Sequence, residues 1–390
     1  MALARRQIAY DRARTLRFPH TFARKCARMR ASPLAFLRGA APLFYHLLRE
    51  DPSLAAGPAG KGWLAGDLHI ENFGAFVTQA DGQKHAATVF DLNDFDDCMI
   101  GPVRFDLLRL STSLILAARE LGADGGQALH MVDQLIDAWG DHVCTVTRLP
   151  GTPQPVLELI EQVRTRTRVD LLDARSRVRG GRRAFVRGPR YADLPRAIAK
   201  ALPAAFEGYL QSLPENRRPS RAQARIVDAA FRIAGTGSLG VLRVAVLVHG
   251  KGDPNGNWIF DLKQQGTPAG AAFGRAPPGP PAERLLQGMC ACLVAQPRLV
   301  GTTRLVGVSM LGRRLSPQED KLDLTRINGV DLPPLARYLG ALLGNAHRRG
   351  GARVSRRAWT FAARRALVTR AIRLAGVHEA AYLAYCALTA

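Results

Sequence analysis

Residues 65–76 read AGDLHIENFGAF, and this stretch decides how the rest of the chain is interpreted. Four polar side chains that can bind protons or cations fall within six residues: Asp67, His69, Glu71 and Asn72. Glycines stand on both sides of them, and an apolar run begins at Phe73. The pattern predicts a short polar loop that leads into a strand, which is either a capped turn or part of a site.

The length and charge of the chain limit the classes of protein to consider. Its 390 residues exceed the usual range for a single core, so two lobes or domains are expected. Lysine and arginine number 55 against 32 acidic residues, a formal net charge of +23 that attracts nucleotides, phosphorylated metabolites or nucleic acid. Nucleic acid is the less favoured partner, because the arginines are scattered without a block of like charge.

The spacing of the cysteines and the length of the apolar runs help to predict the cell compartment. Six cysteines show neither a pairing pattern nor a CxxC motif, so a disulfide framework and a zinc site are both disfavoured. All six are predicted to be reduced core residues: Cys26, Cys98, Cys144, Cys290, Cys292 and Cys386. No apolar run reaches the roughly 18 residues of a spanning helix, and the N-terminal segment lacks a signal peptide's apolar centre. A cytoplasmic protein that does not enter a membrane is therefore expected.

In the first half of the chain, the apolar pattern predicts helices on both sides of one hairpin. Residues 1–58 are predicted to be helical, with a helix start at Ser32. Residues 75–94 predict two strands about an Asp81-Gly82 turn. Residues 106–213 are again predicted to be helical, interrupted by a basic loop at 175–190.

The second half begins with a plausible linker at 212–223. Residues 241–265 then predict two strands around a turn of Gly, Asp, Pro and Asn. A helix near 282–296 and a strand-like run at 302–312 follow, and the chain from 332 to its end is predicted to be helical. We therefore divide the chain into 1–213, a second lobe at 214–325, and C-terminal helices at 326–390.

The polar loop contains a spacing with a chemical meaning. Asp67 and Asn72 are five residues apart, as in the catalytic loop of kinases. There the aspartate accepts the proton of the attacking hydroxyl, and the asparagine holds a magnesium ion. His69 and Glu71 could instead recruit a metal, but no further histidines stand at the ligand spacing that zinc requires.

A carboxylate cluster follows the predicted hairpin. Residues 89–97 read VFDLNDFDD, and four carboxylates so close together need cations, hydrogen-bond donors or solvent. A magnesium site would supply the cation, with Asp91 at the strand end as the preferred ligand and Asp94 as the competing assignment. The alternative is an acidic surface turn.

The third element is the sequence GTGSLG at 235–240, followed by two strands, the second of which ends near Lys263. This glycine loop does not open a helix, which disfavours a dinucleotide fingerprint. A kinase holds ATP phosphates with the same succession of elements, namely a glycine loop, a strand, a turn, a second strand and a lysine. Candidate nucleotide-binding residues are therefore Gly235, Gly237, Ser238, Gly240 and Lys263, with Glu283 as the lysine's helical partner.

The order of these elements is not that of an ordinary kinase, where the glycine loop precedes the catalytic loop. Circular permutation explains it: the catalytic lobe begins the chain and the glycine-loop lobe follows. The helix at 334–351 is similar to the one that precedes the catalytic loop in aminoglycoside-phosphotransferase-like kinases. We expect this helix to pack beside the Asp67 loop.

Taken together, these motifs resemble a known bacterial family. The segments SPLAFLRGAAPLFY, GDLHIENFG, FDLNDFDD with GPVRFDLLRLSTS, GTGSLG and LGALLGNAH are similar to domain of unknown function 2252, from about Met29 onward. The resemblance implies an α+β, protein-kinase-like fold but brings no substrate with it. The chain departs from the expected Lys-Glu pair of the lysine strand, where it has Gln264 and Gln265.

The leading hypothesis is an ATP- and magnesium-dependent phosphotransferase that acts on a hydroxyl acceptor. Asp67 would be the base, Asn72 and Asp91 or Asp94 the metal ligands, and Lys263 the phosphate clamp. Arg38 and Arg104 would be extra phosphate contacts or structural surface residues. The alternatives are a non-catalytic, pseudokinase-like nucleotide-binding module and a basic nucleic-acid-binding protein.

Overall fold

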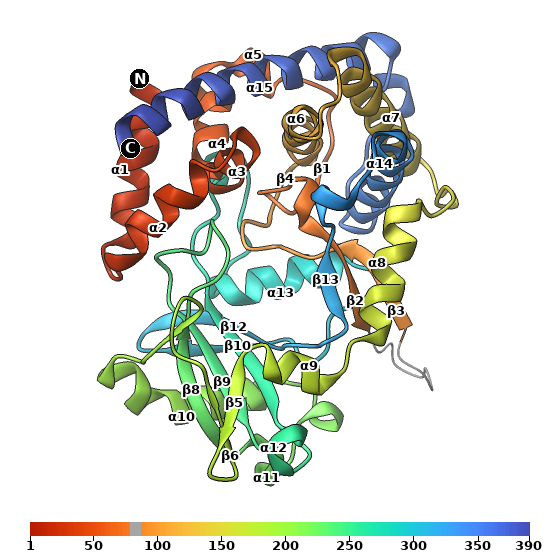
Figure 1. Cartoon of the computed structure of the whole chain (residues 1–390). Helices are drawn as coiled ribbons and strands as arrows, with labels where there is room; N and C mark the ends of the chain where they lie inside the picture. The colour runs from red at the N-terminus through yellow and green to blue at the C-terminus, as the bar shows by residue number, and fades with distance from the viewer. Residues whose placement is uncertain (79–86) are drawn as a thin grey trace.

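The computed structural model describes residues 1–78 and 87–390 and has a mixed α+β fold (Figure 1). Helices gather at one end of the molecule and a six-stranded sheet at the other, with α13 (Pro281–Cys292) between them. We call these parts the helical lobe and the sheet lobe. Each has its own apolar core, one built mainly from helices and the other from the sheet and α10.

The helical lobe contains both ends of the chain, and the last helix runs back across the first ones (Figure 1). Its helices are α1 (Ala2–Thr15), α2 (His20–Met29), α3 (Pro33–Gly39), α4 (Ala41–Glu50), α5 (Pro52–Ala55), α6 (Arg104–Glu120), α7 (Gly125–Cys144), α8 (Gln154–Thr165), α14 (Leu332–Arg349) and α15 (Phe361–Thr389). Its strands form two small antiparallel sheets: β1 (Lys61–Leu64) with β4 (Met99–Pro102), and β13 (Glu319–Lys321) with β2 (Phe73–Thr78) and β3 (Ala87–Leu92).

Helix α6 is the centre of this lobe, and its polar residues are accommodated by local bonds. It packs against α7, α15, α3 and α14, so most of its surface is buried. The hydroxyls of Thr112 and Ser113 donate hydrogen bonds to the carbonyls of Leu108 and Leu110, respectively, both at 2.8 Å. Ser113 also accepts a bond from the Ile70 amide at 3.1 Å, which ties the polar loop to the helix.

The sheet lobe is an antiparallel sheet of strand order β11-β12-β10-β9-β8-β7. The strands are β7 (Tyr191–Ala192), β8 (Ile226–Arg232), β9 (Arg243–Val248), β10 (Trp258–Gln264), β11 (Gly301–Leu305) and β12 (Val308–Arg314). Side chains alternate along β10. Phe260 and Leu262 join the core with α10 (Arg196–Ser212), while Asp261 and Lys263 point the other way. The opposite face of the sheet is therefore the one that meets the helical lobe.

Several sequence predictions are confirmed by these elements. Ser32 caps α3 by accepting a bond from the Ala35 amide, and β2 pairs with β3 as the predicted hairpin. The Asp81-Gly82 turn lies outside the described residues. Strands β9 and β10 pair as expected, and the chain after 332 is mainly α14 and α15. None of the described helices is long and apolar enough to cross a membrane.

Two predictions need correction. The basic loop at 175–190 is instead a hairpin of β5 (Ser176–Arg179) and β6 (Arg182–Phe185), because Gly180 and Gly181 both adopt positive φ and close a tight turn. The six cysteines are free, but only three are buried, and Cys290 is exposed. A residue at the outer face of a helix is solvated even when its neighbours on the inner face are core.

The change from one core to the other does not fall at residue 213. Strand β7 and helix α10 precede that point, yet both pack in the sheet lobe. Strand β13, in contrast, lies after β12 and pairs with β2 of the helical lobe. The chain therefore enters the sheet lobe before the predicted linker and leaves it just before β13.

The loop at 65–67 is held by a buried carboxylate on α6. Asp106 accepts bonds from the Ala65 amide at 2.6 Å and the Gly66 amide at 2.9 Å, and it is 1% exposed. His347 of α14 faces the same carboxylate at 3.1 Å. The Trp139 N–H donates to Nδ1 of His347 at 3.0 Å, so Nε2 carries the hydrogen that is given to Asp106. Helix α14 thus packs beside the Asp67 loop through Asp106.

Asp106→Ala should lower the free energy of unfolding by about 3 kcal/mol, because it leaves two buried amides and His347 without their acceptor. Urea unfolding measures this loss. Asp137→Ala is the control: Asp137 is 52% exposed and pairs with Arg364 at 2.8 Å, so its removal should cost less than about 1 kcal/mol. Equal losses in the two variants would contradict the role given to Asp106.

Candidate functional site

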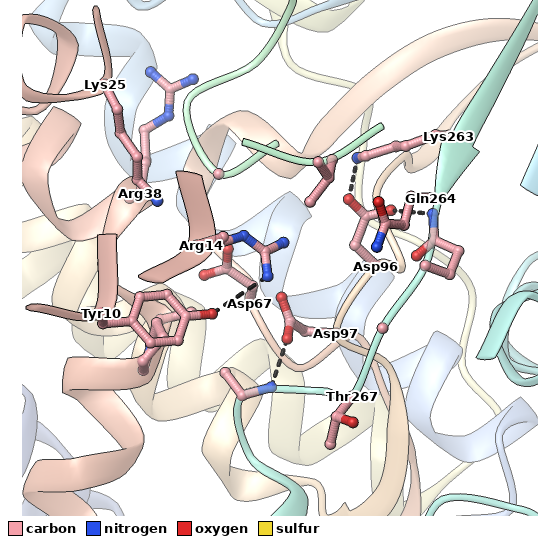
Figure 2. Close-up of a pocket in the computed structure, with 18 residues that line it drawn as sticks. Tyr10, Arg14, Lys25, Arg38, Asp67, Asp96, Asp97, Lys263, Gln264 and Thr267 are labelled. Atoms are coloured by element: carbon pink, nitrogen blue, oxygen red, sulfur yellow. Dashed lines mark hydrogen bonds and ion pairs between the residues drawn. The ribbon is translucent and has the colours of Figure 1, made fainter. Parts of the chain in front are cut away.

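The polar loop, the carboxylate cluster and the glycine loop meet in the cleft between the lobes. A cavity of about 210 Å³, here called the loop cavity, is lined by Arg14, Arg38, Ala65, Asp67, His69, Glu71, Asn72, Asn93, Asp94, Asp96, Asp97, Gly235, Thr236, Gly237, Ser238 and Lys321. A second one of about 80 Å³, the N-terminal cavity, also reaches Lys263 (Figure 2), and it shares with the loop cavity Arg14, Arg38, Asp67, Asp96, Asp97 and Gly237. Three segments far apart in the sequence therefore contribute to one continuous site.

Asp67 lies where the two cavities meet, and Arg109 of α6 fixes its orientation. The Arg109 Nε donates to Oδ1 of Asp67 at 2.7 Å, and a second nitrogen of Arg109 donates to the Leu37 carbonyl at 2.8 Å. Within the described residues, Oδ2 of Asp67 has no hydrogen-bond partner. Burial raises the pKa of Asp67 from 3.8 to about 7, while Arg109 opposes the rise and Asp97 adds to it. The carboxyl can therefore take up and release a proton near neutral pH.

Asn72 and Asp94 line the loop cavity, whereas Asp91 does not. Asn72 donates its side-chain N–H to the Asp67 carbonyl at 2.8 Å, which leaves its amide oxygen for another contact. Asp94 accepts a bond from the Asp96 amide at 3.2 Å through one oxygen. Burial raises the pKa of Asp94, and the charge of Asp96 adds to the rise. A carboxylate and an amide oxygen thus share the same cavity.

The carboxylate of Asp91 is hydrogen-bonded to residues of the helical lobe. It accepts bonds from the Leu92 amide at 2.9 Å and the Val294 amide at 3.4 Å, and Arg349 of α14 stands at 3.5 Å. Asp91 is 3% exposed, and burial raises its pKa against the opposing charge of Arg349. The geometry therefore favours Asp94 over Asp91 as the cation ligand and gives Asp91 a structural role.

Lys263 points from β10 into the cleft and pairs with Asp96 (Figure 2). Gln265 donates to the other oxygen of Asp96 at 3.2 Å, so one of the two glutamines that replace the expected Lys-Glu pair contributes to this contact. Although burial opposes the change, Lys263 lowers the pKa of Asp96 and keeps it ionised. The pair joins the two lobes across the site.

Glu283 is not the partner of Lys263. It is exposed in the first turn of α13, and no cavity described above includes it. The next residue, Arg284, instead donates to the Asp96 carbonyl and to the Gly266 carbonyl, both at 2.9 Å. The glutamate that was expected to pair with Lys263 is thus exposed. Arg284, the residue after it, instead supports the carboxylate cluster through its bond to the Asp96 carbonyl.

The glycine loop lies over the loop cavity. Gly235, Thr236, Gly237 and Ser238 all line this cavity, and Arg28 donates to the Gly235 carbonyl at 2.5 Å. Gly240 has a different role: its φ is +93°, and a Cβ there would stand 2.6 Å from the Arg14 carbonyl. The end of the loop is therefore pressed against the end of α1, and only glycine fits that approach.

His69 and Glu71 do not form a metal centre. His69 is 6% exposed, and burial lowers its pKa well below the usual value, so the ring is neutral. Glu71 pairs with Arg38 and with Lys321, the latter at 2.7 Å. Across the part of the chain that the structure describes, no three His, Cys, Asp or Glu side chains are grouped to hold a metal ion.

A larger cavity of about 650 Å³ adjoins the loop cavity and shares Asn93, Gly235 and Lys321 with it. Apolar side chains such as Phe76, Leu92, Met289 and Leu293 form part of its wall. Arg232, Arg243 and Arg313 form another part, and the first two pair with the buried Asp261 behind them.

Sequence reasoning did not single out Arg109, Arg14 or the arginines around Asp261. One feature of the sequence could have indicated Arg109. It lies three residues after Asp106 on a largely apolar helix, so the two side chains share a face. Arg104 was singled out but lies outside the cleft, where it donates to the carbonyls of Ala55 and Pro58.

Comparison with protein families connects this site to a known group. A family model described as "Uncharacterized protein conserved in bacteria (DUF2252)" matches residues 17–388. The chain belongs to this family. The match covers the glycine loop, the polar loop and the C-terminal helices of this DUF2252 protein. No curated protein and no solved structure matches the chain.

Asp67 should titrate near pH 7 rather than near 3.8, and Arg109→Gln should move its titration to higher pH because it removes the opposing charge. Carboxyl-detected NMR with Asp67→Asn for assignment measures both values. A folded-state pKa above the unfolded value means that the protonated carboxyl contributes stability in acid, which is lost as the pH rises through about 7. Titration of Asp67 near pH 4 would contradict the geometry.

Proposed function

We propose that this DUF2252 protein is an ATP- and magnesium-dependent phosphotransferase of kinase-like, circularly permuted fold, acting on a hydroxyl acceptor. One observation carries the proposal: Asp67, Asn72, Asp94, the glycine loop and Lys263 line two connected cavities between the lobes. A bound triphosphate requires charge from both sides at once, from a cation held by carboxylates and from backbone N–H groups with an ammonium.

The order of elements around the cleft supports the permuted kinase assignment. The glycine loop is followed by β9, by β10 with Lys263, by α13 and then by β11 and β12. A kinase would continue through the helix before its catalytic loop. Here α14 ends against β1, where the Trp63 amide donates to the Gly350 carbonyl at 2.8 Å, and β1 leads directly to Asp67. This order around the cleft supports a kinase-like path in space with a permuted order along the chain.

The sizes of the cavities suggest where a nucleotide would bind. A nucleoside needs a cavity of several hundred Å³, which the cavity of about 650 Å³ provides and the loop cavity of about 210 Å³ does not. We therefore assign the nucleoside to the larger cavity. Its phosphates would extend past Gly235 under the glycine loop, with Lys263 at the far end of the cleft.

The cation site fits magnesium in the character of its ligands. Magnesium is normally bound by one or two carboxylates, with substrate phosphates and water completing the shell. Asp94 and the amide oxygen of Asn72 would hold the ion, which supplies positive charge beside the phosphates when it is bound. A cage of three or more protein carboxylates is not needed for this.

Asp67 is the group that would move a proton in the transfer. Arg109 holds Oδ1, so Oδ2 is the oxygen available to the acceptor hydroxyl. The hydroxyl oxygen forms a bond to the γ-phosphorus as the bond to the bridging oxygen of ADP breaks. The hydroxyl proton passes to Asp67, and ADP leaves with the bonding electron pair.

The cation assignment is tested by thermal unfolding with the non-hydrolysable analogue AMP-PNP, with and without magnesium. Asp94→Asn should abolish the additional stabilisation that magnesium gives, because a ligand that binds only the folded state raises its stability. Asp91→Asn is the matched control and should keep that increment relative to its own baseline. An increment lost in Asp91→Asn but kept in Asp94→Asn would reverse the assignment. No shift with AMP-PNP in the wild type would refute nucleotide binding.

Asp67→Asn should reduce phosphoryl transfer by about a thousandfold, because an amide cannot accept the hydroxyl proton. AMP-PNP affinity should change by less than about twofold, as the side chain keeps its shape. Consumption of [γ-³²P]ATP with a pool of cell metabolites as acceptors measures transfer, and calorimetry measures binding. AMP-PNP binding by a wild type that transfers nothing would favour a pseudokinase-like module instead.

A further inference from the structure

The N-terminal cavity includes segments that the nucleotide assignment does not use. Its wall includes Tyr10 and Arg14 of α1, Lys25 of α2, and the loop at 264–269. At about 80 Å³ it is too small for a nucleoside, and it shares no lining residue with the larger cavity. Asp67 lines it, so a hydroxyl placed there would reach the proposed base.

The cations of this cavity differ in how far they are neutralised. Lys25 pairs with Asp11 at 2.7 Å, and both side chains are almost fully buried. Lys263 forms an ion pair with Asp96. Arg14 is different, because within the described residues it has no ion-pair partner and its side chain makes one hydrogen bond, to the Tyr10 hydroxyl at 3.4 Å. Figure 2 shows its guanidinium beside Tyr10, within the cavity wall.

A second positive charge stands close by. Arg38 and Lys321 both contact Glu71, so two cations share one carboxylate and one positive charge is left over. Arg38 lines both the loop cavity and the N-terminal cavity. Besides Asp96, two carboxylates line both cavities: Asp67 is paired with Arg109, and Asp97 accepts a bond from the Ala269 amide at 2.6 Å.

We propose that the N-terminal cavity binds the acceptor, and that this acceptor is a small hydroxyl compound with a phosphate or carboxylate group held by Arg14 and Arg38. This inference rests on the proposed function for the identity of the reaction, but the anion site itself does not require it. A guanidinium without a carboxylate partner is suited to an anionic group, because it offers several N–H donors in a fixed plane. The small volume favours a compound of a few heavy atoms.

The position of α1 connects the acceptor pocket to the glycine loop. Gly240 of the glycine loop is pressed against the Arg14 carbonyl, so the end of α1 and the end of the glycine loop form one contact. Arg14 and Asp67 line the same two cavities. An anionic group bound by Arg14 would direct a neighbouring hydroxyl toward the base, which is the positioning that transfer requires.

Calorimetry with three compounds of the same carbon skeleton tests this proposal. Glycerol, glycerate and glycerol 3-phosphate are titrated into full-length protein, both alone and saturated with magnesium and AMP-PNP. Glycerate or glycerol 3-phosphate should bind at least tenfold more tightly than glycerol, and the tighter of the two identifies the anionic group. AMP-PNP occupies the nucleotide phosphates' place, so binding in its presence reports a separate site.

Arg14→Gln should weaken binding of the preferred anion at least tenfold in protein saturated with magnesium and AMP-PNP, and any loss of AMP-PNP affinity should be smaller than this loss, although Arg14 also lines the loop cavity. Arg5→Gln is the control, as Arg5 is exposed on the same helix and lines neither cavity. Equal binding of all three compounds, or an equal loss of AMP-PNP affinity in Arg14→Gln, would overturn the acceptor site. Arg14-dependent anion binding without any AMP-PNP binding would instead sustain the anion site and refute the phosphotransferase.

Discussion

The carboxylate of Asp106 is the constraint on which the arrangement of the cleft depends. It lies in the first turn of α6, and it holds two amides of the polar loop and the ring of His347. A buried carboxylate must be matched by donors, and these donors come from two separate parts of the chain. The position of the Asp67 loop is therefore set by α6 and α14 together, rather than by the loop's own sequence.

One turn further along α6, Arg109 extends the same constraint to the site. It is fully buried, and it bridges Asp67 to the Leu37 carbonyl of α3. The N-terminal helices, the polar loop and α6 thus share one hydrogen-bonded unit. This unit places Asp67 at the junction of the two cavities with one oxygen held and the other available, a geometry suited to proton transfer at a fixed point.

The two lobes are joined at the site by polar contacts. Lys263 and Gln265 reach from the sheet lobe to Asp96, and Arg284 of α13 supports the same segment through its carbonyl. The glycine loop meets α1 through Gly240. A ligand that enters the cleft would touch both lobes at once. Charge-assisted hydrogen bonds at such a boundary orient the lobes and remain sensitive to an anionic ligand that competes for the same donors.

The sequence determined the local elements and the residue types of the site. Apolar periodicity and turn residues located the β2–β3 hairpin, the β9–β10 pair and the C-terminal helices, because these signals act over a few residues. It also identified Asp67, Asn72, the glycine loop and Lys263 as candidates. The 175–190 hairpin was missed, since its short strands are charged and lack an alternating apolar face.

Only the tertiary structure decided which of these residues face one another. The sequence favoured Asp91 over Asp94 as a cation ligand, but in the structure Asp91 stands beside Arg349 and Asp94 lines the cleft. The sequence predicted Glu283 as the partner of Lys263, but in the structure Lys263 pairs with Asp96. Arg14 and Arg109 acquire their roles through contacts between segments distant along the chain. Such contacts depend on how whole elements pack, and no local pattern encodes that packing.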